Sequence, residues 1–138
     1  MESEKIEFIK EHSVGIISTC DNDMPHGVPI YYYFDKEKEL FYFVTKNVTK
    51  KYSNLIKNKN AFLTIFREDP QAVFTAECIA ESLDCSKDDC LDIMDSLIEI
   101  HTTQEYYPSP ISMIKEGALK LIKLEIKNSN FKSYRQNI

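Results

Sequence analysis

The sequence predicts an α+β chain, mainly β, in which a small antiparallel barrel of six strands is accompanied by two or three short helices. Short runs rich in aromatic and β-branched residues recur along the chain, and dense turn signals separate them. Other stretches carry apolar residues at helical spacing instead. Short, evenly spaced strands favour a sandwich or a barrel, and a closed barrel leaves no unpaired edge.

The first half of the chain is expected to form a short helix and then three strands. The helix covers residues 3–12, with Ser3 as its cap and Glu4 in its first turn. Turn-forming or charged residues at 21–25 and 35–39 separate the strands. These strands are expected at 14–20, at about 27–34 and at 40–44.

The second half alternates between helical and strand patterns. A helix begins after Thr49, because Tyr52 and Leu55 fall on one helical face. Residues 86–89 resemble a helix cap, and the segment 106–110, with two prolines, cannot continue the helix that follows this cap. The remaining strands are expected at 61–66, about 71–82 and 118–126, with fraying at 128–138.

Length and composition predict one globular domain over residues 1–138. A chain of 138 residues can build one core but not two. A mean hydropathy of −0.36 and the lack of a long apolar run argue against a membrane span. The first residues have neither the basic start nor the apolar core of a secretory signal, so a cytoplasmic location is expected.

The charge balance argues against nucleic acid as a partner. The formal net charge is −5, and an acidic surface repels a polyphosphate backbone unless the cations cluster. Lysines gather once, around residues 46–51. Such a local patch suits a ligand the size of a single phosphate group.

The four cysteines suggest neither a disulfide framework nor a metal site. Disulfides are not expected in a reducing cytoplasm. The spacing of Cys78, Cys85 and Cys90 lacks the close pairs of zinc or iron–sulfur sites. Cys78 and Cys90 are expected to be small core residues, and no metal site is predicted.

The segment from Thr45 to Lys51 is the strongest candidate for a binding site. It joins a strand end to a helix start, where free amide donors and the helix dipole attract anions. The hydroxyls of Thr45 and Thr49 could add hydrogen bonds, and Lys46, Lys50 or Lys51 could add charge. The alternative is that Thr49 only caps a solvated helix whose lysines favour solubility.

Other candidate residues are weaker. His26 follows a turn and is expected at the surface, whereas His12 and His101 are expected at helix ends, near the last carbonyl groups. The sequence assigns no catalytic residue.

The aromatic runs 31–33 and 41–43 place large side chains on both faces of a strand. This pattern indicates a dimer, because monomers seldom expose large apolar patches.

Five segments, taken in order, resemble the pyridoxamine 5′-phosphate oxidase-like FMN-binding split-barrel superfamily. Each segment is degenerate, but their order and spacing together are specific. They are Val14-Gly15-Ile16-Ile17-Ser18-Thr19, Met24-Pro25-His26-Gly27-Val28-Pro29-Ile30-Tyr31, Leu40-Phe41-Tyr42-Phe43-Val44-Thr45, Thr49-Lys50-Lys51 leading to Asn54-Leu55 and Asn58, and a long strand ending Cys78-Ile79-Ala80-Glu81.

The resemblance implies a six-stranded split barrel of Greek-key type that works as a homodimer, with FMN at the subunit interface. Val44 and Thr45 would then lie beside the ribityl chain or the phosphate. Thr49, Lys50 and Lys51 would bind the phosphate, with Lys50 where the family often has arginine. The residues expected to line the flavin ring, largely through their main chain, are Val28, Pro29, Ile30, Tyr31 and Tyr32.

The same resemblance implies an FMN-dependent oxidoreductase that passes electrons from a reduced donor such as NAD(P)H to a small-molecule acceptor. The chain lacks the C-terminal Arg-x-His signature of the true pyridoxamine-phosphate oxidases, so that reaction is not expected. Haem or deazaflavin could replace FMN in relatives of this size. Two alternatives stay open, namely a flavin- or haem-binding protein for storage or sensing and a dimerisation module without a cofactor.

Overall fold

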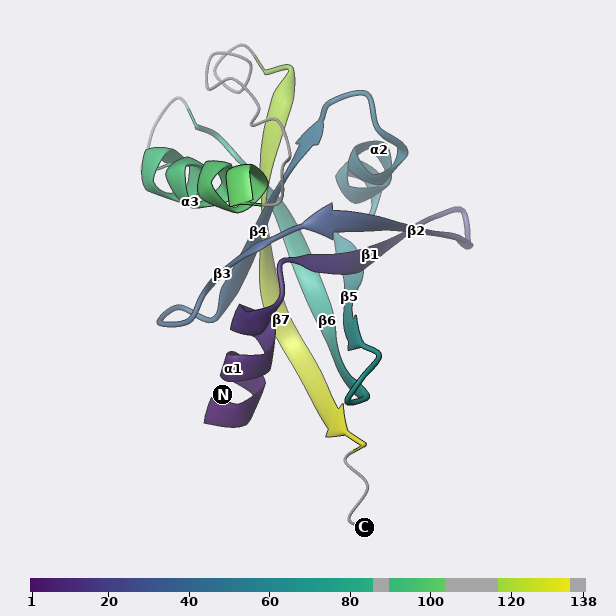
Figure 1. Cartoon of the computed structure of the whole chain (residues 1–138). Helices are drawn as coiled ribbons and strands as arrows, with labels where there is room; N and C mark the ends of the chain where they lie inside the picture. Colours follow the sequence, from purple (N-terminus) through teal and green to yellow (C-terminus); the bar gives the residue numbers. More distant parts are fainter. Residues whose placement is uncertain (86–89, 104–116, 135–138) are drawn as a thin grey trace.

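The computed structural model describes residues 1–85, 90–103 and 117–134, which form a curled antiparallel sheet of seven strands with three helices packed around it (Figure 1). The mainly β class is as predicted, but the strand number is seven rather than six. The sheet order is β2-β1-β5-β6-β7-β4-β3. In chain order the elements are α1 (Ser3–Glu11), β1 (Val14–Asp21), β2 (Met24–Tyr31), β3 (Tyr33–Asp35), β4 (Leu40–Lys46), α2 (Lys50–Lys57), β5 (Asn60–Arg67), β6 (Ala72–Leu83), α3 (Cys90–Thr103) and β7 (Leu119–Ser133).

The extra strand arises because the chain leaves the sheet at Tyr32. The sequence predicted one strand at about 27–34, but β2 pairs with β1 and β3 pairs with β4, at opposite ends of the sheet order. The Tyr32 N–H donates to the Ser13 carbonyl at 2.9 Å, and its hydroxyl donates to the Ile9 carbonyl at 2.6 Å. These bonds fix the point at which the chain crosses from one edge to the other.

The β1–β2 hairpin is tighter than the sequence suggested. Asn22 and Asp23 have φ values of 50° and 63°, the backbone that a two-residue hairpin turn requires. Asparagine and aspartate tolerate this conformation better than other side chains do. The strand β2 therefore begins at Met24 rather than near residue 27.

Two other boundaries also differ from the prediction. The N-cap of α1 is Glu2, without a side-chain hydrogen bond, so Ser3 is not the cap. The strand β7 runs to Ser133 because β6 is long enough to pair with it, for example at Phe74 and Phe131. Residues 128–133 are thus paired rather than frayed. The expected helix cap at 86–89 and the segment 106–110 lie outside the described residues.

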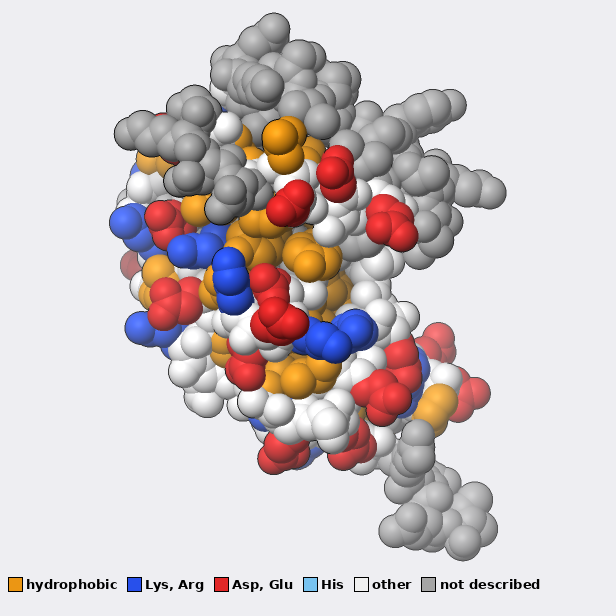
Figure 2. Space-filling view, turned by 90° about the vertical axis from the view of Figure 1, so that its left-hand side faces the viewer, with side chains coloured by type: hydrophobic (Ala, Val, Ile, Leu, Met, Phe, Trp, Pro, Cys, Tyr) orange, Lys and Arg blue, Asp and Glu red, His pale blue; other side chains and the backbone are white. Residues whose placement is uncertain are grey.

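The inner face of the curled sheet holds the main core. Phe41, Phe43 and Phe74 are fully buried there, and Phe8 and Ile9 of α1 pack against the same cluster. A second apolar cluster lies between α3 and the outer face of β4 and β7. Figure 2 looks onto the side that carries α3 and β3, where acidic and basic groups surround a band of hydrophobic side chains. No patch of one charge dominates this side.

The cysteines depart from the sequence prediction in one respect. Cys85 follows β6 and Cys90 begins α3, and the two form a disulfide with a Cα–Cα distance of 5.4 Å. The expectation of no disulfide was therefore wrong, because the two Cα atoms lie within the distance that a disulfide spans. Cys78 is a buried core residue as predicted, and burial raises its thiol pKa to about 12.

No helix of the described residues is long and apolar enough to cross a membrane.

Candidate functional site

The connection between β4 and α2 forms the candidate site. Thr49 is the N-cap of α2, as predicted, and its hydroxyl oxygen accepts the Tyr52 N–H at 3.3 Å. The hydroxyls of Thr45 and Thr49 are 2.7 Å apart, and both also lie within hydrogen-bond distance of the Lys46 carbonyl. Thr45 is almost fully buried. The two threonines therefore form one hydroxyl pair at the start of the helix.

The first turn of α2 also offers backbone donors. Within the described residues, the amides of Lys50 and Lys51 donate to no protein acceptor, as is usual at a helix start. These amides lie at the N-terminal end of α2, which is the positive end of the helix dipole. The loop is held in place because the Asn47 amide donates to the Ala118 carbonyl at 3.0 Å. Amide donors and hydroxyls together suit an anionic group.

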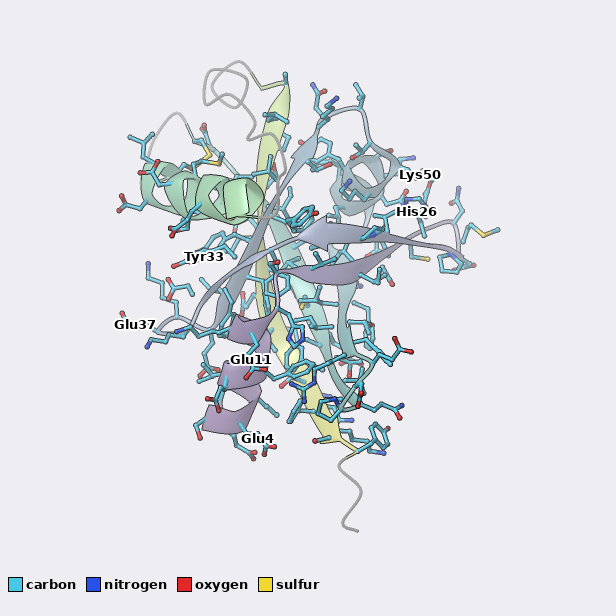
Figure 3. All side chains as sticks on the ribbon, in the orientation of Figure 1. Glu4, Glu11, His26, Tyr33, Glu37 and Lys50 are labelled. Carbon is cyan, nitrogen blue, oxygen red and sulfur yellow. A yellow bond between two sulfur atoms is a disulfide. The ribbon has the colours of Figure 1, made fainter. Side chains whose placement is uncertain are left out.

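The lysines of this segment differ in their surroundings. The Lys50 ammonium lies 3.8 Å from the Asp21 carboxylate, and Lys57 lies 3.4 Å from the same carboxylate oxygen. Figure 3 shows Lys50 on the side of α2 that faces the β1–β2 hairpin. Lys46 is exposed at the end of β4. Asp21 therefore lies close to Lys50, although the sequence analysis did not place this carboxylate at the site.

Lys51 is the lysine best suited to an anion. It is half-buried, and within the described chain no carboxylate lies within 4.0 Å of its ammonium. Burial lowers the pKa of Lys51 because desolvation disfavours the charged form. A bound anion would stabilise the charged form of Lys51, so the local electrostatics favour a negative group at this site.

The β2 segment lies beside this site. The curled sheet brings β2 into contact with both α2 and β4, although β2 and β4 are far apart in the sheet order. Val28 and Ile30 point into the core, whereas Pro29 and Tyr31 lie on the outer face opposite Ile16 and Val14. The segment therefore offers its main chain and two outer side chains to a ligand.

Two residues that were expected to contact the flavin, Tyr32 and Val44, use their side chains for packing within the protein. The side chain of Tyr32 is buried, and burial raises its pKa well above the usual range because the hydroxyl has left water. Val44 packs against the cluster under α3, on the opposite face of β4 from Thr45. Contact between these two residues and a ligand would therefore run through their backbone.

The structure adds Lys120, which the sequence analysis missed, and gives the contacts of Asn54. The Lys120 ammonium of β7 lies 6.0 Å from the centre of the Tyr52 ring, over the first turn of α2. Asn54 is fully buried and donates to the Thr19 hydroxyl at 3.0 Å, which ties α2 to β1. The Asn54 side-chain oxygen has no donor among the described residues. The local sequence around Lys120 does not single it out, because its neighbours depend on how β7 pairs with β4.

The histidines do not form a metal or catalytic cluster with other described residues. His12 follows α1, and its Nδ1 lies 2.7 Å from the Phe8 carbonyl, which agrees with its expected place at a helix end. His26 lies on β2 opposite Thr19. The side chain of His101 lies outside the described residues. In the part of the chain that is described, no three His, Cys, Asp or Glu side chains gather as metal ligands.

The chain is similar to known proteins in its sequence pattern and in its fold. A family model described as pyridoxamine 5′-phosphate oxidase matches residues 1–128. No curated protein matches the sequence. Several solved structures share the fold at low sequence identity, which supports the fold alone.

Three of these structures are described as proteins of different kinds. General Stress Protein 26 from Bacillus anthracis has a TM-score of 0.70 and 19% identity, with 93% of this chain and 91% of that chain covered. A FAD-binding protein from Mesorhizobium loti has a TM-score of 0.69 and 15% identity, covering 93% and 89%. HutZ, the heme storage protein from Vibrio cholerae, has a TM-score of 0.67 and 14% identity, covering 96% and 93%.

Proposed function

Because the chain belongs to the pyridoxamine 5′-phosphate oxidase family, we propose that it is a flavoprotein that binds FMN at the start of α2 and acts as an oxidoreductase. The observation that carries this proposal is the hydroxyl pair of Thr45 and Thr49 at the start of α2, whose first turn also carries Lys51, a half-buried lysine with no carboxylate within 4.0 Å among the described residues. We further propose that residues 1–138 form one split-barrel domain of Greek-key type. A similar fold in a protein described as FAD-binding supports a flavin as the ligand.

The residues present fit the phosphate end of FMN. Free amide donors, hydroxyls and an ammonium group are the usual ligands of a phosphate monoester. The amides of Lys50 and Lys51 and the two threonine hydroxyls would hold the phosphate oxygens, and Lys51 would add charge. Lys50 would contribute less than the family pattern implies, because its side chain is exposed and its ammonium lies 3.8 Å from the Asp21 carboxylate. The β2 main chain would lie along the flavin ring.

Bound FMN supplies two-electron chemistry between a reduced donor such as NADH or NADPH and a small-molecule acceptor. The protein's part is to bind and orient the cofactor and to keep one ring face accessible. No described side chain is assigned a proton-transfer role. This suits a reaction in which the cofactor carries the redox step.

A second candidate is storage or sensing of haem or flavin without turnover. The similar fold of a protein described as a heme storage protein favours this alternative. The propionate groups of haem are anions too, so the lysines at the start of α2 could serve either ligand. The absorption spectrum distinguishes the two.

The protein purified without added cofactor is expected to be yellow, or to become so on addition of FMN, with a flavin absorption spectrum. NADH or NADPH should bleach the bound flavin under nitrogen, and air should restore the colour. A Soret band and no flavin binding would point to haem storage. Flavin binding without bleaching by either nucleotide would leave storage of flavin as the function.

We also propose that the protein is a homodimer with the cofactor at the subunit interface. Val14, Ile16, Phe62 and Phe66 are exposed on the outer face of the adjacent strands β1 and β5. A hollow of about 480 Å³ lies among three of them. Apolar groups gathered on one face call for a covering partner. The same face carries Pro29 and Tyr31 of the β2 segment, so a second copy seated there would adjoin the flavin ring.

The variant Phe62→Lys is expected to raise the dimer dissociation constant by at least about ten-fold, because an unpaired charge would be buried at an apolar contact. Sedimentation velocity over a concentration series measures this change. Leu91→Lys, at an exposed position on α3, is the matched control and should dimerise normally. A wild-type protein that stays monomeric at high micromolar concentration would contradict the proposal.

A further inference from the structure

We infer that Lys120 of β7 is a phosphate-binding residue of the α2 site and that it makes the site prefer a phosphate monoester over the corresponding free alcohol. The inference rests on the proposed function, since it concerns the same flavin site. No family pattern found in the sequence included Lys120. Its place follows from the pairing of β7 with β4.

Strand register puts Lys120 next to the hydroxyl pair. Lys120 pairs directly with Thr45 in the antiparallel β4–β7 ladder, so their side chains share one face of the sheet. Thr45 Oγ1 is 2.7 Å from Thr49 Oγ1, the N-cap hydroxyl of α2. The Lys120 ammonium also lies over the ring of Tyr52, whose amide donates to that same hydroxyl. The strand pairing with Thr45 and the approach of the ammonium to the Tyr52 ring therefore both place Lys120 near the helix start.

Lys51 and Lys120 differ from the other half-buried lysines of the described residues in the partners of their ammonium groups. The other half-buried lysines have an acceptor, because Lys5 donates to the Ser129 hydroxyl and Lys123 pairs with Glu81 at 3.0 Å. Within the described residues, neither Lys51 nor Lys120 has a carboxylate within 4.0 Å. Partly desolvated ammonium groups are unfavourable without a counter-charge. Both flank the first turn of one helix, where the dipole is already positive.

The local backbone holds Lys120 in this position. Gly117 has a φ of +85°, which turns the chain just before β7 begins, and the Asn47 amide bonds to the Ala118 carbonyl. This bond ties the β4–α2 loop to the start of β7. The contact with the Tyr52 ring limits the freedom of the long side chain. A lysine held near this ring has less conformational freedom to lose when it binds a ligand.

The chemistry favours a phosphate monoester dianion. Two ammonium groups and the two amides at the start of α2 offer more donors than one carboxylate can use. Lys50 lies 3.8 Å from the Asp21 carboxylate and Lys46 is exposed, so Lys51 and Lys120 are the half-buried lysines that would neutralise the two charges of the phosphate. Riboflavin, which lacks the phosphate, would gain nothing from Lys120.

The test compares FMN with riboflavin. Lys120→Met removes the charge and keeps an unbranched stem over Tyr52, and Lys120→Arg restores the charge. Lys123→Met is the matched control, because it lies on the same strand and pairs with Glu81 instead. Flavin fluorescence quenching gives dissociation constants for both ligands, and circular dichroism checks folding. Lys120→Met is expected to weaken FMN binding by about ten-fold and to leave riboflavin binding within about two-fold.

Each outcome bears on a different claim. If wild-type protein binds neither flavin, the proposed function fails and this inference fails with it. If the wild type binds FMN but Lys120→Met weakens FMN and riboflavin equally, or weakens neither, only the role of Lys120 is overturned. If Lys120→Met weakens binding of iron protoporphyrin IX and not of FMN, the residue serves a carboxylate ligand and the phosphate role is rejected. Rescue of FMN affinity by Lys120→Arg supports it.

Discussion

Phe41→Ala is expected to lower the free energy of unfolding by about 3–5 kcal/mol, the largest stability effect predicted for this chain. Phe41 has no exposed surface and lies at the centre of the inner core. Its ring centre is 4.7 Å from that of Phe34, 5.3 Å from that of Tyr32 and 6.0 Å from that of Phe74. Alanine would leave a cavity that three neighbouring rings cannot fill without moving.

Equilibrium unfolding in urea measures this effect, with all variants at one protein concentration because a dimer's apparent stability depends on it. Tyr134→Ala is the matched control, since it also removes a large ring but from a side chain that is 48% exposed. The control should lose no more than about 1 kcal/mol. A loss below about 1 kcal/mol for Phe41→Ala itself would contradict the central place of β4 in the core.

The sequence predicted local structure well where one residue type decides it. Thr49 caps α2 because a threonine before an amphipathic run has an oxygen for the first free amides. The alternation of Leu124 and Ile126 with Lys123 and Glu125 predicted part of β7 correctly. In both cases the determining pattern spans only a few neighbouring residues. Such patterns can be read without knowing the tertiary structure.

The errors concern contacts between distant segments. The break at Tyr32 depends on the carbonyls of Ile9 and Ser13, which only the folded chain brings near. The extension of β7 depends on the length of β6. The Cys85–Cys90 disulfide is different, because it joins residues only five apart and was missed through the expectation of a reducing compartment. Local propensity carries no information on any of these.

The candidate site shows the same division. The hydroxyl and amide donors come from one continuous segment, and the sequence predicted them together. The neutralising role of Asp21 and the approach of Lys120 come from other strands, and they change the ranking of the lysines. A strand-register prediction could have found Lys120, since its pairing with Thr45 is the decisive fact.

Lys51→Ala is expected to weaken FMN binding by about 1–3 kcal/mol, or roughly 5- to 150-fold, the scale of a lost hydrogen bond to a charged group. Lys51 is half-buried and has no carboxylate partner among the described residues, so its ammonium is available to the phosphate. Isothermal titration with FMN at neutral pH measures the change. Lys57→Ala removes a lysine from the same helix that is exposed and paired with Asp21, so this control should bind FMN normally.

The pH dependence of FMN binding gives a second readout of Lys51. Burial lowers the pKa of Lys51, so in the free protein its charge is lost at a lower pH than that of an exposed lysine. Wild-type affinity should therefore fall as the pH rises toward that lowered pKa, whereas the affinity of Lys51→Ala should change less.

Thr49→Ala should also weaken binding, through loss of the cap hydroxyl. Unchanged FMN affinity in both Lys51→Ala and Thr49→Ala would show that the phosphate binds elsewhere, because together these residues supply the charge and the hydroxyl on which the site depends.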